Sequence, residues 1–379
     1  MAYENDTMKM KALADAIEGK KKPDRSCLIG FDGYIDELYS VVQKRMGPEE
    51  YTAYDKIEDF GRRILWASGK SADLEICPHK IKFGGNAPIL ANTLASLNYR
   101  TTCIGQLDTD DGDSPFAKMH PCCKRISTGK ASRTIALEFR DGKIMLGNLQ
   151  GSHTGWEEIR EKTGAGRLSS LVEDSSLIGM VNWGGMYRMN EIMEGMAEEM
   201  LFPMKAELKR KKDIFLDLAD PSARPEGDME RLFALIRRLA GDFRVTVGMN
   251  ENEAGKIGDQ FCGGEESMEE TGEKIRKALH LNRLVIHTNH RVFGFADGLV
   301  EEYAGMHVEN PVQTTGAGDH FNAGFCLGIL ENRSLYENLV LGQATASCYI
   351  STGKTPDRAA LADYIRKHYH FIDERKNND

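Results

Sequence analysis

A glycine-rich turn that leads into a helix carries the strongest chemical signal in this sequence. Residues 314–319 read Thr-Thr-Gly-Ala-Gly-Asp, and apolar residues at helical spacing follow them. Two glycines let the backbone pass close to a ligand, and the free N–H groups of such a turn point together at the positive end of the helix dipole. The turn is therefore predicted to bind an anion. Asp319 is a candidate base for a hydroxyl that attacks this anion, although a tight turn whose Asp319 complements the helix dipole explains the turn alone equally well.

A second candidate site follows the apolar strand predicted over residues 244–249. Asn250 and Glu253 stand three residues apart where this strand gives way to a short helix. A glutamate near a phosphate site can hold metal-bound waters, because Mg²⁺ keeps most of its hydration shell. The same spacing is typical of a capping box, with Asn250 at the N-cap and Glu253 at N3. The motif alone does not decide between these two interpretations.

Two further motifs place polar groups beside flexible backbone. Gly84 and Gly85 precede Asn86 and a predicted helix, so Asn86 could bind a ligand or cap the helix. Asp32 and Asp36 follow the first predicted strand, where carboxylates can bind sugar hydroxyls. An ordinary Asp-Gly turn is the simpler explanation of Asp32 and Asp36 taken alone.

The elements that must position these motifs alternate between short strands and amphipathic helices. The predicted strands are 27–31, 101–105, 134–139, 143–146, 177–182, 213–218, 244–249, 284–288 and 292–296. The predicted helices are 56–67, 87–97, 190–201, 229–239, 268–279, 319–330, 336–351 and 358–370. This alternation predicts an α/β protein with a mostly parallel sheet covered by helices on both faces. Ligands bind at the carboxyl ends of the strands in such sheets, and most of the motifs fall there.

The segment from about residue 100 to 150 has a different pattern. Its strands 134–139 and 143–148 are joined by Arg140-Asp141-Gly142, and Asp-Gly is a strong hairpin signal. We expect a small antiparallel element that stands off the main sheet. Residues 42–80 are charged and weakly periodic, and we interpret them as an insertion that contains some helix.

The composition excludes several classes of partner. The chain has 379 residues and a formal net charge of −9, which argues against binding to nucleic acid or to an anionic membrane. No run of about 18 apolar residues occurs, and the first residues lack the apolar core of a signal peptide. Several of the eight cysteines lie in apolar strand or helix patterns. This favours buried, reduced thiols in a cytoplasmic protein.

In this order, the motifs resemble the signatures of the ribokinase family, also called the PfkB carbohydrate kinases, from about residue 26 to 355. Residues 314–325 are similar to the second family signature and keep its Gly-Ala-Gly-Asp core. Residues 250–253 are similar to the Asn-x-x-Glu motif, and residues 84–86 to the Gly-Gly substrate loop. Weaker likenesses to the Gly-x-x-x-Asp and Asp-Pro-x-x-Arg patterns cover residues 105–112 and 217–224.

The resemblance implies a three-layer α/β/α ribokinase-like fold over a single domain, residues 1–379. A small β lid would come from segments within about 36–50 and 100–150. The implied reaction is phosphoryl transfer from ATP, with Mg²⁺, to a hydroxyl of a sugar or sugar-like substrate. Such a lid, with its exposed edges, could also pair two copies of the chain as a homodimer.

The resemblance also implies a role for each matched residue, with Asp319 as the general base. The other implied site residues are Gly316, Ala317 and Gly318 as the anion hole; Asn250, Glu253 and Thr288 for the nucleotide, with Glu253 holding Mg²⁺ through water; and Asp36, Gly84, Gly85 and Asn86 for the substrate. Trp183, after another predicted strand, could stack on a sugar, although a tryptophan at a strand end is more often packed in the core.

The chain departs from the family pattern at three positions. Gln313 stands where the second signature usually begins with Asp, and that Asp often helps to hold a monovalent cation, so dependence on such a cation is doubtful. Asn289 stands where a glycine is usual, and Ile89 where the substrate loop usually has Asn. A nucleoside kinase of the same fold is an alternative, which an apolar or aromatic lid pocket would favour. A non-catalytic ligand-binding homologue is a third reading, against which the intact Asp319 and Glu253 argue.

Overall fold

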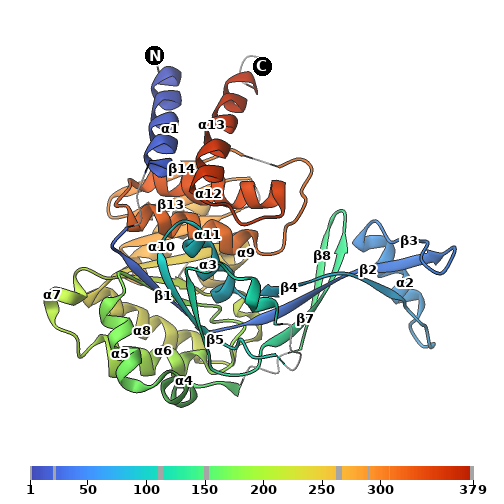
Figure 1. Ribbon diagram of the computed structural model, residues 1–379, viewed down its shortest axis with the longest axis horizontal. Coiled ribbons are helices and arrows are strands. Elements are labelled where there is room, and N and C mark those ends of the chain that lie inside the picture. The colour runs from blue at the N-terminus through green and yellow to red at the C-terminus, as the bar shows by residue number, and fades with distance from the viewer. Residues whose placement is uncertain are drawn as a thin grey trace.

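The computed structural model describes residues 2–19, 23–109, 114–148, 153–261, 267–288, 290–306 and 308–375, with side chains for the described residues between 8 and 368 (Figure 1). Three residues that belong to the motifs or to the cysteine count above lie outside these ranges: Gly112, Asn289 and Cys262.

A nine-stranded sheet forms the centre of the molecule, in the order β14-β13-β12-β11-β10-β9-β1-β5-β6. Its strands are β1 (Ser26–Gly30), β5 (Arg100–Gly105), β6 (Cys123–Ser127), β9 (Leu177–Val181), β10 (Asp213–Asp217), β11 (Arg244–Asn250), β12 (Arg283–His287), β13 (Val292–Ala296) and β14 (Leu299–Tyr303). The pairs from β12 to β6 are all parallel, and only β13 and β14 run antiparallel at one edge. The carboxyl ends of seven neighbouring strands therefore share one edge of the sheet.

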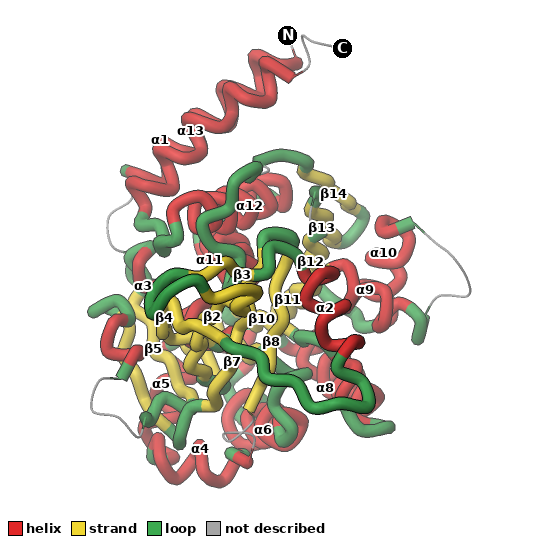
Figure 2. Tube along the Cα trace, turned by 90° about the vertical axis from the view of Figure 1, so that its right-hand side faces the viewer, coloured by secondary structure: helices red, strands yellow, loops and turns green. Residues whose placement is uncertain are grey.

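Helices cover both faces of this sheet, each over its own hydrophobic cluster (Figures 1 and 2). One face carries α1 (Ala2–Glu18), α3 (Asn86–Ser96), α11 (Ala317–Leu330), α12 (Leu335–Thr352) and α13 (Arg358–Arg375). The other face carries α4 (Trp156–Thr163), α5 (Ala165–Asp174), α6 (Met189–Gly195), α8 (Asp228–Asp242), α9 (Glu251–Gly258) and α10 (Met268–Ala278). A short helix, α7 (Ala206–Lys209), lies between α6 and β10. This is the α/β architecture with a mostly parallel sheet that the sequence predicts.

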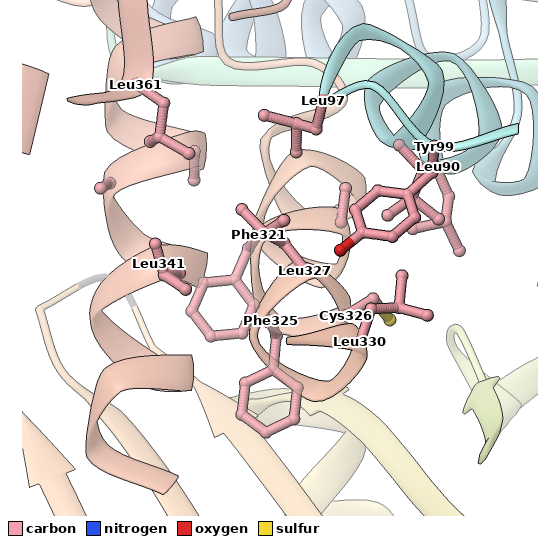
Figure 3. Close-up of a cluster of buried hydrophobic side chains, with 14 of the residues drawn as sticks. Leu90, Leu97, Tyr99, Phe321, Phe325, Cys326, Leu327, Leu330, Leu341 and Leu361 are labelled. Carbon is pink, nitrogen blue, oxygen red and sulfur yellow. The ribbon is translucent and has the colours of Figure 1, made fainter. Parts of the chain in front are cut away.

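Helix α11 is the central helix of its layer, buried all round from His320 to its last residue (Figure 3). Its phenylalanines, including Phe325, pack among leucines from neighbouring helices. A Cβ added at Gly324 would lie 2.2 Å from the carbonyl oxygen of Leu341, so glycine allows the backbones of α11 and α12 to approach each other closely. Because α11 is packed on every side, the turn at its N-terminus is held on a rigid support.

A second, five-stranded sheet stands to one side of the body (Figure 1). It contains β2 (Tyr34–Arg45), β3 (Tyr51–Ala53), β4 (Ile76–Gly84), β7 (Ser132–Phe139) and β8 (Gly142–Asn148), with α2 (Ile57–Trp66) packed against it. We call these five strands and α2 the lid. The predicted hairpin is β7–β8, and the predicted helix over 56–67 is α2.

The lid differs in extent from the sequence expectation. Strand β4 begins inside the region interpreted as an insertion and ends beyond it, and β2 begins just before the segment 36–50 expected to contribute to the lid. The predicted strand over 101–105 belongs to the main sheet as β5, and β6 joins it there. Thus only the later part of the 100–150 segment contributes to the lid.

Candidate active site

The carboxyl ends of β1, β9 and β10, the N-terminus of α11 and the inner face of the lid meet at one place. Four carboxyl groups come together there, from Asp32, Asp36, Asp217 and Asp319. The negative charge of each of the first three raises the pKa of Asp319. The structure therefore brings the turn at residues 314–319 together with the region between the first two strands, as the sequence motifs require.

The turn before α11 has a conformation that favours glycine. Gly316 is the N-cap of α11 and has φ +94°. The N–H of Ala317 closes the turn on the carbonyl oxygen of Thr314 at 3.1 Å. Among the described residues, no hydrogen-bond acceptor faces the N–H groups of Gly316 and Gly318. These two donors are available to an anion, whereas the Ala317 donor is already shared within the turn.

Two aromatic residues fix this turn from the helix side. The hydroxyl of Tyr349 donates to the carbonyl oxygen of Thr315 at 2.8 Å, and the Tyr349 ring stacks on His320 with centroids 3.7 Å apart. His320 Nδ1 lies 2.7 Å from the carbonyl oxygen of Gly316, and burial lowers the pKa of His320 to about 4. Because a carbonyl oxygen can only accept a hydrogen bond, Nδ1 carries the proton. His320 is therefore a neutral imidazole that donates from Nδ1 to Gly316.

Asp319 lies in the first turn of α11 and keeps some exposed surface, as a base that must reach a substrate requires. Removal of its carboxyl group from bulk water raises the pKa of Asp319 well above its ordinary value, and the nearby charges of Asp217 and Asp32 raise it further. Lys143 acts in the opposite direction. A carboxylate with a raised pKa is a stronger base than an exposed one, so the geometry suits Asp319 for accepting a proton.

Asp32 is fully buried and holds the start of α3. Its carboxylate accepts the backbone N–H of Asn86 at 2.9 Å and of Ala87 at 2.7 Å, and the side-chain amide of Asn182 at 2.7 Å. Asp32 therefore caps a helix that begins 54 residues later in the chain. The predicted N-cap role of Asn86 is wrong, because Gly85 is the N-cap and Asn86 is already inside the helix.

Asp217, at the end of β10, is a second buried carboxylate in this group. It accepts side-chain amide N–H groups from Asn86 at 3.2 Å and from Asn322 at 2.5 Å, and the backbone N–H of Ala219 at 3.1 Å. Ala219 has φ +54°, a region that L-residues rarely adopt. The side chain of Asn86 thus points to Asp217 at the strand ends and not to its own helix.

Asp36 reaches the site from the lid. It lies in β2 opposite Lys82 of β4 and Thr134 of β7, and the three residues share one face of the lid sheet. A Cβ added at Gly84 would lie 2.3 Å from Asp36 Oδ2, so only glycine leaves room for this carboxylate. Burial raises the pKa of Asp36.

Asn250 and Glu253 form the capping box that the sequence allows. The Asn250 side chain accepts the Glu253 N–H at 2.9 Å, and the Glu253 carboxylate accepts the backbone N–H of Asn250 at 3.0 Å. Glu253 is nevertheless buried beside Asp217, and burial followed by the Asp217 charge raises its pKa. The capping box therefore does not exclude a role near a cation, since a cation close to these two carboxylates would relieve their repulsion.

Thr288 and the residue before it have different surroundings. The Thr288 hydroxyl donates to the Arg291 carbonyl oxygen at 3.0 Å and accepts the Arg291 N–H at 2.9 Å, so it closes the turn between β12 and β13. His287, at the end of β12, lies closer to the anion turn: a Cβ added at Gly318 would be 3.6 Å from His287 Cε1. Burial lowers the pKa of His287 to about 4. Sequence analysis missed His287, which only its position at a strand end could have indicated.

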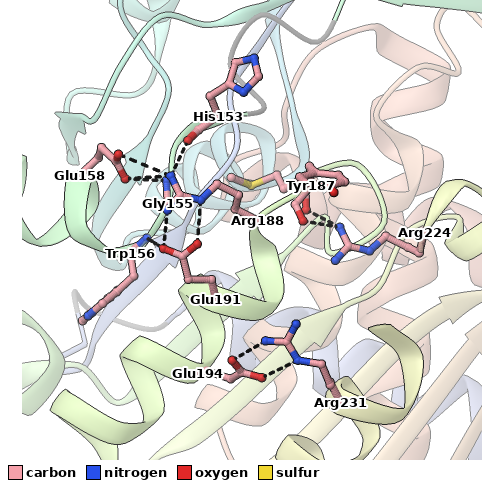
Figure 4. Close-up of polar contacts among 11 residues, drawn as sticks. His153, Gly155, Trp156, Glu158, Tyr187, Arg188, Glu191, Glu194, Arg224 and Arg231 are labelled. Atoms are coloured by element: carbon pink, nitrogen blue, oxygen red, sulfur yellow. Dashed lines mark hydrogen bonds and ion pairs between the residues drawn. The ribbon is translucent and has the colours of Figure 1, made fainter. Parts of the chain in front are cut away.

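The loop after β9 begins at Asn182, which contacts Asp32 at the site, and is anchored in the core by Trp183. Trp183 is buried, donates to Asn190 at 2.7 Å and packs against the guanidinium of Arg224, 4.6 Å from the ring centroid. Arg224 in turn donates to the carbonyl oxygens of Met186 and Tyr187 (Figure 4). Trp183 is therefore a core residue, as the simpler interpretation held, and this packing positions the backbone that precedes it.

Three lysines of β4 and β8 point into the site from the lid. Lys82 Nζ donates to the Thr315 carbonyl oxygen at 3.1 Å, and Lys143 Nζ donates to the Thr315 hydroxyl at 3.1 Å. Lys80 Nζ donates to the amide oxygen of Gln313 at 3.3 Å. Sequence analysis assigned none of these lysines to the site, because lysines on a polar strand are usually solvated.

Comparisons with known proteins agree with this architecture. A family model described as prokaryotic ketohexokinase matches residues 5–368. A curated ketohexokinase from Haloferax volcanii is 27% identical over 379 aligned positions, which cover 96% of this chain and 95% of that protein.

Two solved structures show the same fold. Adenosine kinase from Sinorhizobium meliloti has a TM-score of 0.60 and 17% identity, with 91% of this chain and 99% of that chain covered. Ribokinase from Arabidopsis thaliana, complexed with ribose and ATP, has a TM-score of 0.59 and 15% identity, with 90% and 99% covered. The predicted ribokinase-like fold is confirmed. No helix in the described ranges combines the length and apolar character that a membrane span requires.

The raised pKa of Asp319 predicts that replacing this residue stabilises the protein. A carboxyl group whose pKa is higher in the folded state contributes stability at low pH, and this contribution is lost as the pH rises through the folded-state pKa. Asp319→Asn should therefore raise the melting temperature at pH 8 by at least about 1 °C. The gain should vanish below about pH 4, where the wild-type carboxyl is also neutral.

The matched control is Asp73→Asn, which changes an exposed aspartate in the loop between α2 and β4 and should leave the melting temperature unchanged. Calorimetric scans of the three proteins at both pH values make the comparison. A lower melting temperature for Asp319→Asn at pH 8 would contradict the assigned electrostatics.

Proposed function

The chain belongs to the prokaryotic ketohexokinase family and is a carbohydrate kinase, and from this premise we propose that it transfers the γ-phosphoryl group of ATP to a hydroxyl of a ketohexose. The single observation that carries the proposal is the position of Asp319. Its carboxylate, with a raised pKa, lies in the same turn as the unpaired N–H groups of Gly316 and Gly318. A proton acceptor beside an anion site is what transfer of a phosphoryl group to an alcohol requires.

The proposed step balances in atoms and charge. The substrate hydroxyl oxygen attacks the γ-phosphorus of ATP, and its proton passes to the Asp319 carboxylate. The bond from the γ-phosphorus to the bridging oxygen breaks, and its electron pair leaves with ADP. Backbone donors at Gly316 and Gly318, with Ala317 keeping the turn compact, would stabilise the charge on the phosphoryl oxygens during transfer.

Substrate hydroxyls would be bound by groups of the lid and of the loop before α3. Asp36 lies on the inner face of the lid and Gly84 packs directly against it. Gly85 and Asn86 form the adjoining backbone, which Asp32 holds in place. Carboxylate and amide groups in this setting can accept and donate hydrogen bonds to several hydroxyls of one sugar.

Nucleotide and Mg²⁺ would lie on the β11 and β12 side of the turn, near Asn250, Glu253 and Thr288. No three His, Cys, Asp or Glu side chains within the described ranges are arranged to hold a metal directly. Glu253, buried beside Asp217, fits a hydrated Mg²⁺ that it would hold through water. When bound, Mg²⁺ supplies positive charge to the ATP phosphates.

A nucleoside kinase remains the second candidate because an adenosine kinase shares the fold. The family match favours the ketohexose, as does the polar lining of the lid face around Asp36. A cytoplasmic location also fits, because all the cysteines that the structure describes are free thiols.

A coupled ADP-release assay across ketohexoses, aldohexoses, pentoses and nucleosides tests the proposal. We expect turnover with a ketohexose such as fructose, and Asp319→Asn should lower kcat by about 10²–10⁴-fold while ATP affinity stays within threefold. Turnover of the variant within tenfold of wild type would refute the role of Asp319. Activity with nucleosides alone would show that the substrate is a nucleoside and not a ketohexose.

We also propose that turnover does not depend on a monovalent cation. Gln313 is neutral where the family usually has Asp, and the Lys80 ammonium group donates to its amide oxygen at 3.3 Å. A fixed ammonium group at this position removes the need for a bound ion. The kcat in K⁺ buffer should stay within twofold of the kcat in tetramethylammonium buffer at equal ionic strength, and an increase of tenfold or more with K⁺ would contradict this proposal.

The lid further supports a homodimer of this chain. Half of the large exposed hydrophobic side chains among the described residues lie on it, including Leu65 and Trp66 of α2, Ile81 of β4 and Leu146 of β8. Strand β8 is also an edge strand, with unpaired backbone groups along one side. We propose that a second copy of the lid covers this surface.

Sedimentation equilibrium tests the dimer. Wild type should sediment as a dimer at micromolar concentration, and Leu65→Glu/Leu146→Glu should shift the mass to that of a monomer. The control Leu299→Glu changes an exposed leucine of β14 in the main sheet and should leave the mass unchanged. A wild-type monomer, or a double variant that remains dimeric, would exclude this interface.

A further inference from the structure

Two lysines of the lid converge on the anion turn without a carboxylate partner. Lys82 and Lys143 come from different strands, β4 and β8, yet both ammonium groups donate to Thr315, the residue directly before Gly316. Among the described residues, neither ammonium group has a carboxylate oxygen within 4.0 Å. Their partners are instead the carbonyl and hydroxyl oxygens of Thr315 and, for Lys82, also the Tyr349 hydroxyl at 3.3 Å, none of which carries a net charge.

The register of the lid sheet explains how the two lysines reach one place. Lys82 lies opposite Asp36, which in turn lies opposite Thr134, and Lys143 lies opposite Glu138 of β7. Side chains two residues apart share a face, so Lys82 and Lys143 point to the same side of the lid. That side faces the N-terminus of α11, as the bonds to Thr315 require.

This arrangement places three sources of positive potential together: two ammonium groups and the N-terminus of a helix. Burial is the main cause that lowers the pKa of Lys82 to about 8; the charge of Asp36 acts in the opposite direction, and the charges of Lys143 and Lys80 act in the same direction as burial. The charges of Asp36 and Asp319 act on Lys143 from beyond ion-pair distance, so the two ammonium groups keep hydrogen-bond donors that can bind an anion. If the two lysines served only to neutralise Asp36 and Asp319, we would expect direct ion pairs between their ammonium groups and these carboxylates.

We propose that Lys82 and Lys143 are catalytic residues that bind the oxygens of the phosphoryl group during its transfer. This inference rests on the proposed kinase function and adds the groups that complete its anion site. The N–H groups of Gly316 and Gly318 bind the phosphoryl group from the helix side, and the two ammonium groups bind it from the lid side. Because both lysines belong to the lid, the charge compensation is complete only when the lid lies over the turn. Phosphoryl transfer to water is disfavoured while the lid is away.

Lys82→Met and Lys143→Met test the proposal in the full-length protein. Each should lower kcat by about 10²–10³-fold, the loss typical of one oxyanion donor, while the KM for the ketohexose changes less than threefold. Lys82→Arg and Lys143→Arg keep the charge and should retain more activity than the methionine variants. The matched control Lys44→Met removes an exposed lysine of β2 and should leave kcat unchanged.

A binding measurement separates this proposal from the proposed function. Calorimetry with ADP and aluminium fluoride, a mimic of the phosphoryl group in transit, should show at least tenfold weaker binding for each methionine variant, with ADP alone bound as tightly as by wild type. Methionine variants that keep kcat within fivefold of wild type, or that bind the mimic normally, would overturn the proposal. Arginine variants as inactive as the methionine variants would overturn it too, because charge would then not be the cause. A wild-type protein that phosphorylates no hydroxyl compound would refute the proposed function, and the binding measurement would still decide the role of the lysines.

Discussion

The mutual repulsion of three buried carboxylates and the half-buried Asp319 is the constraint on which this structure depends. Asp32, Asp36, Asp217 and Asp319 meet where strand ends, a helix N-terminus and the lid come together. Each is costly to keep ionised away from water, and together they are more costly. The protein offsets this cost with fixed N–H donors on Asp32 and Asp217 and with lid cations near the other two. Among the residues that the structure describes, no such donor reaches the Asp319 carboxylate, so its proton affinity stays high.

The fold supplies the rigidity that this arrangement needs. Helix α11 is buried all round, so the position of Asp319 cannot relax away from the neighbouring charges. Asp32 ties the start of α3 to the loop after β1, and Asp217 ties both α3 and α11 to the end of β10. Removing one of these ties would change the geometry of the whole group. The strain at Ala219 is tolerated at the same place, which is common where function fixes a backbone.

Most of the main sheet and the turn at residues 314–319 could be predicted from the sequence, because buried parallel strands and helix starts have strong local patterns. The lid hairpin β7–β8 could be predicted as well, but β2, β3 and β4 could not. Strand β4 carries a proline and two lysines and is largely exposed, so its polar and apolar residues alternate only over residues 80–83. Lys82 and Lys143 escaped notice for the same reason, since only the cross-strand register shows where they point. The helix-capping role of Asp32 depends on residues far along the chain, which no local pattern reveals.

The central claim is that Asp319 and the adjoining turn act together on one phosphoryl group and one hydroxyl. A crystal structure of the protein with a ketohexose, ADP and aluminium fluoride tests this most directly. The account predicts a sugar hydroxyl oxygen within about 3.2 Å of the Asp319 carboxylate and the fluoride group against the N–H groups of Gly316 and Gly318. A sugar bound with every hydroxyl out of hydrogen-bond reach of Asp319, or a fluoride group bound elsewhere, would contradict it.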